Sequence, residues 1–522
     1  MQIRSNSAPR TLASAPKTQD AKPQAEEKDF NYNPQDPATL GNDTATISVR
    51  AENGGVETDT VKLDNKEAVF FFGRLIRVKD DPDYKLNPNA DGNFVFDQSH
   101  ESYTGANAFS ASAATVNKYN EVYSELTGKK IEWAFGDDQL LVSPETGDWP
   151  NAFYARQMKG VHFFDVEGTS TGNSGEVASH EVGHAVLDAL RPNFLGGSGP
   201  ETGAFHEAFG DVLAMLMNLG NDTAVEKLVA QTGGDLSSKR NIVSDMGEGF
   251  GNAIGLSGGI RNSFNTFTYK DPATLPERGD ETQLGHEVHD FSRLWSGAFY
   301  DVLDGISDAN RASGMSPEKA LKAAGEEGWK LLIGQMENAS RSSQTTFKDM
   351  AVSLMQGDAQ FNGGQRQDLI RDIMVKRELL PEGAGLFKSE DITFSGNVVE
   401  KEITLGDDFG ALAGVKMDTL VDQPIFASFT DSAMNSVASE AEKGVKMMLA
   451  NDQILFTSDG QAPELTEMFK ADGSVYKAYV ANNENGEQEL TKVPLAVCDF
   501  SHGPDGHHHH DHGHIHGENC QH

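Results

Sequence analysis

Two histidines in the run GEVASHEVGHAVLDALRP have the spacing of two ligands of one metal ion. His180 and His184 stand four residues apart, which in a helix places both imidazoles on one face, about one turn apart. Glu181 follows the first histidine and could act as the general base toward a metal-bound water. The neighbouring residues are mostly aliphatic, so a pair of solvated surface histidines does not explain this run. We therefore predict a Zn2+ site on this helix.

A second run, ETGAFHEAFGDVLAMLM, supplies a third ligand. Glu207 and Asp211 stand four residues apart on a helix that is otherwise largely apolar. Carboxylates in such surroundings are costly to bury unless they meet a cation or a hydrogen-bond donor. We expect Glu207 to bind the zinc, with water in the fourth position, and Asp211 to accept the other ring N–H of a zinc-bound histidine. His206 points about 100° away on the helix, so a surface or packing role is favoured for it.

Taken together, the two runs resemble the thermolysin-like group of gluzincin metallopeptidases. ETGAFHEAFGD follows HEVGH and is similar to that group's Glu-Ser-Gly-Ala-Xaa-Asn-Glu-Ala run. The resemblance covers about residues 104–384, more than half of the chain. It implies an α+β fold with a strand-rich lobe, a helical lobe and the zinc helix between them. It also implies a zinc endopeptidase that hydrolyses bonds in peptide or protein substrates.

Two further runs fit the same group and imply the residues that hold the substrate. NAFY begins 29 residues before the first zinc ligand and is similar to the group's edge strand, which hydrogen-bonds the substrate backbone. The resemblance therefore implies substrate binding at Asn151, Ala152 and Tyr154, along an exposed sheet edge. In EVHDFSRLWSGAFYDVL, His289 matches the group's catalytic histidine, which stabilises the oxyanion. Arg261 lies 28 residues earlier, where the group has the arginine that grips the substrate carbonyl.

One catalytic group of the family is not matched in this chain. The family's tyrosine before the ETGAF run is absent, and Ser198 stands about where it would fall. The interval from His184 to Glu207 is 23 residues, a few more than in the prototype. Loss of one oxyanion donor typically lowers the rate by roughly 10²–10³. The missing tyrosine leaves open an alternative function, a catalytically weak zinc-bound scaffold whose C-terminal domain does the binding.

The family's double calcium site is only partly matched. Asp165, Glu167 and Glu176 fit in sequence order, while Asn218 stands where a glutamate is expected. Carboxylate oxygens are ligands that Ca2+ prefers, so a bound Ca2+ is an open alternative as a second cofactor beside the zinc.

The elements that must position these residues follow from hydrophobic periodicity. Strand-like runs at 44–51, 67–78 and 139–143, with IEWAF at 131–135, predict a strand-rich N-terminal lobe. One helix is expected at 106–126. The helical lobe is expected to contain helices at 176–190, 204–218, 288–303, 317–336, 345–355 and 366–378.

Beyond Pro381 the pattern changes to alternating runs around one amphipathic helix near 431–449. The expected strands are at 391–405, 424–429, 452–458, 475–481 and 489–497. Strands and a helix in this order indicate a separate, small α+β domain.

The chain therefore divides into four segments. Residues 1–42 are rich in Ser, Pro, Gln and Lys and lack aliphatic periodicity, so we expect a disordered leader or linker. Residues 43–384 are the expected metallopeptidase domain, and residues 385–500 are an α+β domain to which no motif gives a role. Residues 501–522 form a histidine-rich flexible tail.

The tail supports a second alternative function. Nine of the 16 histidines lie after residue 500, in SHGPDGHHHHDHGHIHGENCQH, a composition typical of metal binding. A metal-sequestering or metal-delivery protein would nevertheless leave Glu207, Asp211 and His289 without an explanation. Metal stoichiometry separates the two functions, because one tight zinc that survives deletion of the tail supports the enzyme.

Charge and composition exclude some partners. The chain has 79 acidic and 43 basic residues, a net charge of -36, and such a surface repels nucleic acid. No apolar run approaches the roughly 18 residues that cross a bilayer, and no standard secretory signal is visible, so no membrane partner is expected. Cys498 and Cys520 could close only a tail. The family resemblance favours an extracellular protein, while the residues themselves leave localisation and oligomeric state open.

Overall fold

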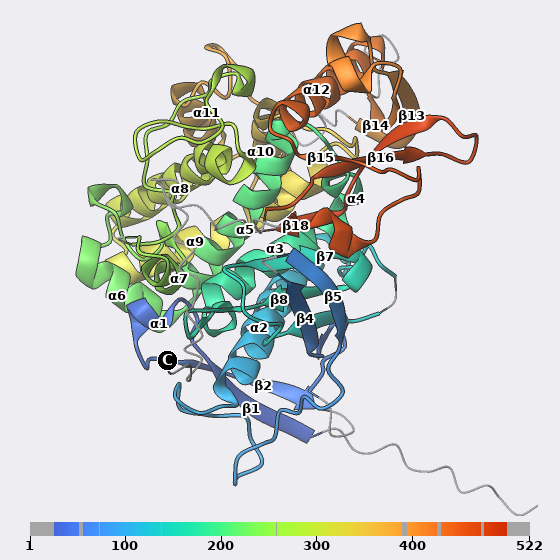
Figure 1. Cartoon of the computed structure of the whole chain (residues 1–522). Helices are drawn as coiled ribbons and strands as arrows, with labels where there is room; N and C mark the ends of the chain where they lie inside the picture. Colours follow the sequence, from blue (N-terminus) through green and yellow to red (C-terminus); the bar gives the residue numbers. More distant parts are fainter. Residues whose placement is uncertain are drawn as a thin grey trace, which may run out of the picture.

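The computed structural model describes residues 26–51, 56–71, 74–136, 138–256, 258–388, 394–424, 430–470 and 474–497. Within these residues the chain is a mixed α+β protein, with strands toward both ends of the sequence and long helices between them (Figure 1). The histidine-rich tail, residues 1–25 of the expected leader and most of the strand expected at 424–429 lie outside the described residues. Among the described helices, none is long and apolar enough to span a bilayer.

The first described segment forms regular structure, whereas the sequence analysis expected disorder up to residue 42. β1 (Glu26–Tyr32) pairs antiparallel with β2 (Ala45–Ala51), and the short helix α1 (Pro37–Leu40) lies between them in sequence. Phe30 is fully buried, and its ring stacks on that of Phe94 with 4.5 Å between centroids. Aromatic rather than aliphatic residues supply the buried surface of β1, which is why the search for aliphatic periodicity missed this strand.

A five-stranded sheet carries the candidate substrate strand. Its members are β3 (Val61–Leu63), β6 (Leu140–Ser143), β7 (Ala152–Ala155), β8 (Gly160–Phe163) and β18 (Leu495–Val497). The order is β18-β7-β8-β6-β3, in which β3, β6 and β8 run parallel and β7 is antiparallel to both of its neighbours. The apolar run at 67–78 forms a separate hairpin of β4 (Lys66–Phe71) and β5 (Arg74–Asp80).

The run IEWAF does not form the expected strand. Residues 131–135 have no strand pairing in the structure. Trp133 and Phe135 are stacked, with 5.9 Å between ring centroids, and the indole N–H of Trp133 donates to the carbonyl of Thr60 (3.2 Å). Burial of aromatic residues in a loop thus produces an alternating pattern that resembles a strand.

Each of the six helices expected between residues 176 and 378 corresponds to a helix of the structure. They are α3 (Gly175–Leu190), α5 (Pro200–Gly220), α8 (Val288–Ala312), α9 (Pro317–Asn338), α10 (Phe347–Phe361) and α11 (Gln367–Lys376), and α2 (Tyr103–Thr127) precedes them. Shorter elements are α4 (Pro192–Leu195), α6 (Asp222–Thr232), α7 (Glu248–Ala253), β9 (Asp165–Val166), β10 (Thr169–Ser170), β11 (Asp245–Met246) and β12 (Arg261–Asn262). Helix α5 packs against both α3 and α8, and the three share one hydrophobic core with the five-stranded sheet.

The C-terminal part of the chain builds a second sheet with its own core. Its strands are β13 (Phe394–Thr404), β14 (Lys416–Pro424), β15 (Ile454–Phe456), β16 (Ala478–Asn482) and β17 (Gln488–Lys492), in the order β13-β14-β17-β16-β15. Helix α12 (Thr430–Ala450) packs against it, and Leu412 and Val445 are fully buried in this core. Strand β14 was not expected from the sequence, because its buried residues include the polar Thr419.

The run expected as one strand over 489–497 is divided at Pro494. β17 ends at Lys492 in the C-terminal sheet, whereas β18 begins at Leu495 in the sheet that contains β7. Proline has no backbone N–H and so interrupts a ladder of hydrogen bonds. The C-terminal domain is thereby joined to the strand expected to bind the substrate (Figure 1).

Candidate metal centre

Helix α3 begins at a capped end and carries both candidate histidine ligands. The hydroxyl of Ser174 accepts a hydrogen bond from the N–H of Val177 (3.3 Å), which caps the first turn. His180, Glu181 and His184 are all buried, with exposed fractions of at most 1%. Polar side chains so enclosed require polar or metal partners. Helix α5 packs against α3 on the side of the two histidines.

Two glycines let α5 approach α3 closely enough for its carboxylates to reach the histidines. A Cβ atom on Gly183 would lie 2.7 Å from the Cα of Gly210, and one on Gly210 would lie 2.6 Å from Nδ1 of His180. Real Cβ atoms essentially never approach other heavy atoms within 3.0 Å, so any larger residue would push the helices apart. The close contact places Glu207 and Asp211 against the histidines.

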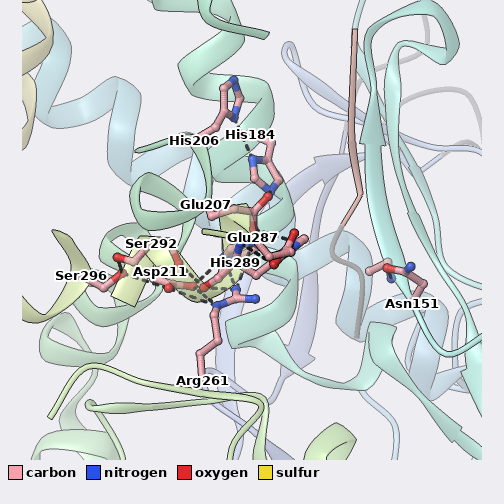
Figure 2. A network of polar contacts seen from close by, with 12 residues as sticks. Asn151, His184, His206, Glu207, Asp211, Arg261, Glu287, His289, Ser292 and Ser296 are labelled. Carbon is pink, nitrogen blue, oxygen red and sulfur yellow. Dashed lines mark hydrogen bonds and ion pairs between the residues drawn. The ribbon is translucent and has the colours of Figure 1, made fainter. Parts of the chain in front are cut away.

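Three buried side chains from the two helices form a cluster in which each offers one ligand atom. Nε2 of His180 lies 3.4 Å from Oε2 of Glu207, and Nε2 of His184 lies 3.7 Å from Oε1 of the same carboxylate. Figure 2 shows His184 and Glu207 pointing toward each other, and all three ligand atoms lie within 4.8 Å of one another. Atoms bound at about 2.0–2.1 Å to one tetrahedral ion are about 3.3 Å apart, close to the two distances from the histidines to Glu207. The cluster is therefore compatible with a metal ion.

Asp211 contacts the other ring nitrogen of the first histidine. Its Oδ1 lies 3.0 Å from Nδ1 of His180 and also accepts from Nη2 of Arg261 (2.7 Å). Ser296 of α8 donates to Oδ2 (3.0 Å). Burial acts to raise the pKa of Asp211, but the charge of Arg261 and the hydrogen bond with His180 lower it to about 2. Asp211 can thus hold a proton on Nδ1 of His180 when Nε2 binds a metal. Without a metal, burial and Arg261 act to lower the pKa of His180, but Asp211 and Glu207 raise it to about 9.

His289 contacts Glu207 from the start of α8. Its Nε2 lies 3.3 Å from Oε2 of Glu207, and its Nδ1 lies 2.9 Å from Oε1 of Glu287. Burial acts to lower the pKa of His289, but these two carboxylates outweigh burial and raise it. Burial likewise acts to raise the pKa of Glu207, yet the charges of His289 and His184 lower it overall. Glu207 is therefore ionised, which is the form that binds a metal.

Sequence reasoning missed two residues that support this site. Glu287 is the N-cap of α8 and accepts from the backbone N–H of His289 (2.9 Å), and an acidic residue directly before an expected helix was the available signal. His206 is buried, and its Nδ1 lies 2.9 Å from Nδ1 of His184. The surface role considered for His206 is therefore wrong. A packing role agrees with its burial, but the contact with the candidate ligand His184 was not expected.

Of the expected substrate-binding residues, Arg261 lies on β12 with its guanidinium on Asp211, and the other three lie on and beside β7. Asn151 is buried, and its Oδ1 accepts from the N–H of Ala152 (2.8 Å). The hydroxyl of Tyr154 donates to Oδ2 of Asp188 (2.7 Å), so this side chain ties β7 to the helix that carries the histidines. The exposed edge expected at β7 is wrong, because β18 pairs with β7 on the side away from β8.

A cavity of about 350 Å³ opens beside Glu207 and His289. One part of its wall comes from the helices around the histidines, and another part comes from the C-terminal domain and β18. Ser198, which stands near the place of the family's tyrosine, is not among the residues that line this cavity. Its hydroxyl donates to the carbonyl of Ala441 on α12 (3.1 Å).

Glu176 belongs to a second group of buried carboxylates. It lies with Asp36 and Glu248 so that their ligand atoms are within 4.8 Å of one another. The backbone N–H of Gly247 donates to Oε2 of Glu176 (3.0 Å), and burial, followed by the charge of Asp36, raises the pKa of Glu248 to about 7. Three such carboxylates are compatible with a hard cation. The companions expected for Glu176 are not in this group, which excludes Asp165, Glu167 and Asn218.

The similarity of this chain to known proteins is structural. No protein-family model matches the chain, and no curated protein matches it. Among solved structures, the chain is similar to the precursor of protealysin, a metalloproteinase from Serratia proteamaculans, with 15% sequence identity and a TM-score of 0.34. That match covers 63% of this chain and 90% of the other.

Proposed function

We propose that this chain is a zinc-dependent endopeptidase with a two-lobed, thermolysin-like body, in which α3 lies between a strand-rich and a helical lobe. The observation that carries the proposal is the buried cluster of His180, His184 and Glu207 on two crossing helices. Three protein ligands leave a fourth position for water, as catalytic zinc sites do. Asp211 holds the ring of a proposed ligand, as acceptors beside metal-bound histidines do. His289, which contacts Glu207, is an addition that a purely structural metal site does not require.

The proposed reaction is hydrolysis of a peptide bond. Zn2+ held by the three ligands would lower the pKa of a bound water and polarise the scissile carbonyl. Glu181, which is fully buried beside His180 on α3, takes up the proton of the attacking water on its carboxylate. The same carboxylate then donates that proton to the nitrogen of the leaving amine. One carboxylate on the zinc helix therefore serves both proton transfers.

His289 and Arg261 are the groups proposed to hold the substrate carbonyl. Glu287 holds Nδ1 of His289, so Nε2 is directed at the cluster. A protonated imidazole at that place stabilises negative charge that develops on the carbonyl oxygen. The guanidinium of Arg261 holds Asp211 and is proposed also to grip the carbonyl on the leaving-group side.

An extended peptide is the proposed substrate, because β7 can bind such a peptide through its backbone in the place that β18 takes in this structure. The amide of Asn151 and the backbone of Ala152 are proposed to align this peptide. Tyr154 contributes its backbone, since its hydroxyl is bound to Asp188. Recognition through backbone groups favours unfolded or flexible polypeptides over folded proteins.

Metal dependence of peptide hydrolysis tests the proposal. We expect a chelator to abolish hydrolysis of an internally quenched peptide and added Zn2+ to restore it. Glu207→Gln is expected to lose the zinc itself, because the carboxylate is a proposed ligand. Hydrolysis by a protein stripped of all metal would overturn the proposal, and so would full zinc binding and activity in Glu207→Gln.

A further inference from the structure

The strand expected to bind the substrate is already paired on both of its sides. β8 lies along one side of β7, and β18 lies antiparallel along the other, with Leu495 opposite Ala155 and Val497 opposite Phe153. Each side of a strand accepts one ladder of hydrogen bonds. A peptide can therefore add to β7 only where β18 now lies.

The same segment forms part of the wall of the cavity beside the metal cluster. Leu495 and Ala496 line that cavity together with His289. Ala496 is buried in the hydrophobic core that the metal helices share. β18 thus pairs with the strand that follows Asn151 and lines the cavity that His289 also lines.

Polar contacts hold the C-terminal domain against the site near β18. Nζ of Lys477 lies 3.4 Å from Oε1 of Glu287, the carboxylate that holds His289. Nζ of Lys492 lies 3.5 Å from the carbonyl oxygen of Leu195, which also lines the cavity. These contacts hold residues 477 and 492 against the wall of the cavity that β18 also lines.

The attachment of β18 permits its release. The strand has three residues, it follows Pro494, and the C-terminal sheet and its core are complete without it. A tethered segment of this kind acts at an effective concentration of roughly millimolar, so it suppresses weak substrates and yields to strong competitors or to cleavage.

We propose that β18 is an autoinhibitory strand that occupies the substrate position on β7, so that hydrolysis requires its release or removal. This inference rests on the proposed peptidase function and concerns the regulation of the same site. The occupant is residues 493–497 of this chain, which lie antiparallel to β7 as an added peptide strand could. The competent fraction of the enzyme is then the fraction in which β18 has left the sheet.

Two shortened chains that differ only in this strand test the proposal. One ends at Val493 and lacks β18, and the other ends at Val497 and keeps β18 while lacking the tail. We expect the zinc-loaded chain that ends at Val493 to hydrolyse a quenched peptide at least about tenfold faster than the other, as a competent fraction of one tenth or less in the longer chain implies. A synthetic peptide of residues 490–497 should inhibit the shorter chain competitively. Equal rates for the two chains overturn the proposal.

A disulfide lock provides a test that does not depend on removing the strand. The chain that ends at Val497 lacks both native cysteines, Cys498 and Cys520. Ala155→Cys with Leu495→Cys places two thiols on directly opposite residues of β7 and β18. We expect the oxidised form to be inactive and a phosphine reductant to restore activity, whereas Leu495→Cys alone responds to neither treatment. Equal activity of the oxidised and reduced forms overturns the proposal.

Failure of the proposed function gives a different result from failure of this inference. If no chain hydrolyses peptide although each binds zinc, the peptidase function is wrong. The strand proposal is then decided by binding of a fluorescent peptide of residues 490–497. Binding to the chain that ends at Val493, and not to the one that ends at Val497, supports occupation of β7, and equal or absent binding contradicts it.

Discussion

The Nδ1 atoms of His184 and His206 lie 2.9 Å apart, although the two residues belong to different helices. Two ring nitrogens at this distance share one hydrogen bond, in which one nitrogen carries the proton and the other accepts it. Because Nε2 of His184 faces Glu207, a metal-bound His184 would carry that proton on Nδ1 and donate it to His206. Burial, the largest effect, lowers the pKa of His206 to about 3, so this residue stays a neutral acceptor. A second imidazole thus fixes the orientation of a candidate ligand.

Replacement of His206 should therefore weaken metal binding. We expect His206→Ala to lower the affinity for zinc by roughly 10–100-fold, because His184 loses the acceptor that orients it. His206→Asn should retain more of the affinity, since an amide oxygen can accept the same hydrogen bond. Competition with a zinc chelator measures the affinity, and His100→Ala, at an exposed histidine, is the control. An unchanged affinity for zinc in His206→Ala would show that His206 has only a packing role.

The glycines at the crossing of α3 and α5 should be intolerant of any side chain. Gly183→Ala would place its methyl 2.7 Å from the Cα of Gly210, so the helices must separate and carry Glu207 away from the histidines. We expect a loss of about 1–3 kcal/mol in the free energy of unfolding, together with weaker zinc binding. Urea unfolding measures the first quantity. Gly220→Ala, near the end of α5 with no atom within 4 Å of its Cβ, is the matched control and should not be destabilising.

Local spacing was sufficient to predict the three candidate ligands, but not the residues that support them. His180 and His184 share a helix face by a rule that involves only neighbours in sequence. The contact of His206 depends on how closely α5 approaches α3, which is set by two glycines and not by any periodic pattern. Glu287 likewise becomes informative only once α8 is known to begin directly after it.

Glu201, at the start of α5, should give the fold a pH dependence separate from the metal centre. Its carboxylate accepts from the hydroxyl of Tyr269 (2.8 Å) and the N–H of Phe347 (2.6 Å), but burial raises its pKa from 4.5 to about 7. A raised pKa in the folded state means that this contribution to stability is full below pH 4.5 and is lost as the pH rises through about 7.

Glu201→Gln should remove that part of the pH dependence. We expect the fall in the free energy of unfolding between about pH 4.5 and pH 8 to be smaller in the variant by about 2–3 kcal/mol. Urea unfolding at both pH values measures the difference. Glu226→Gln, at an exposed glutamate of α6, should leave the dependence unchanged. An identical pH dependence in Glu201→Gln and wild type would show that Glu201 does not cause it.

The carboxylates of Asp36, Glu176 and Glu248 should make the fold responsive to calcium. Three buried carboxylates within 4.8 Å repel one another unless a cation or protons neutralise them. We expect CaCl2 to raise the melting temperature of the zinc-loaded protein above pH 7, and MgCl2 to raise it less, since Mg2+ gives up its waters reluctantly. Glu248→Gln should abolish the response. A melting temperature that does not change with calcium would contradict Ca2+ binding by these three carboxylates.

Contacts between distant parts of the chain account for the main differences from the sequence-based expectations. The NAFY run was correctly expected to form a strand, but nothing near it in sequence indicates that residues 495–497 pair with it. The break at Pro494 was visible in the sequence, whereas the transfer of the following strand to another sheet depends on tertiary packing. The strand β1 was missed for a related reason, because its buried Phe30 packs against Phe94 of a distant loop and Phe109 of α2.

Peptide hydrolysis by Glu181→Gln, measured together with bound zinc, tests the central claim most directly. The amide keeps nearly the shape of the carboxylate but cannot take up a proton from water. In the chain that ends at Val493, we expect Glu181→Gln to bind one zinc per chain while its kcat falls by roughly 10²–10⁴-fold. Zinc-loaded Glu181→Gln that hydrolyses peptide at the rate of the unmodified chain would contradict the proposed function.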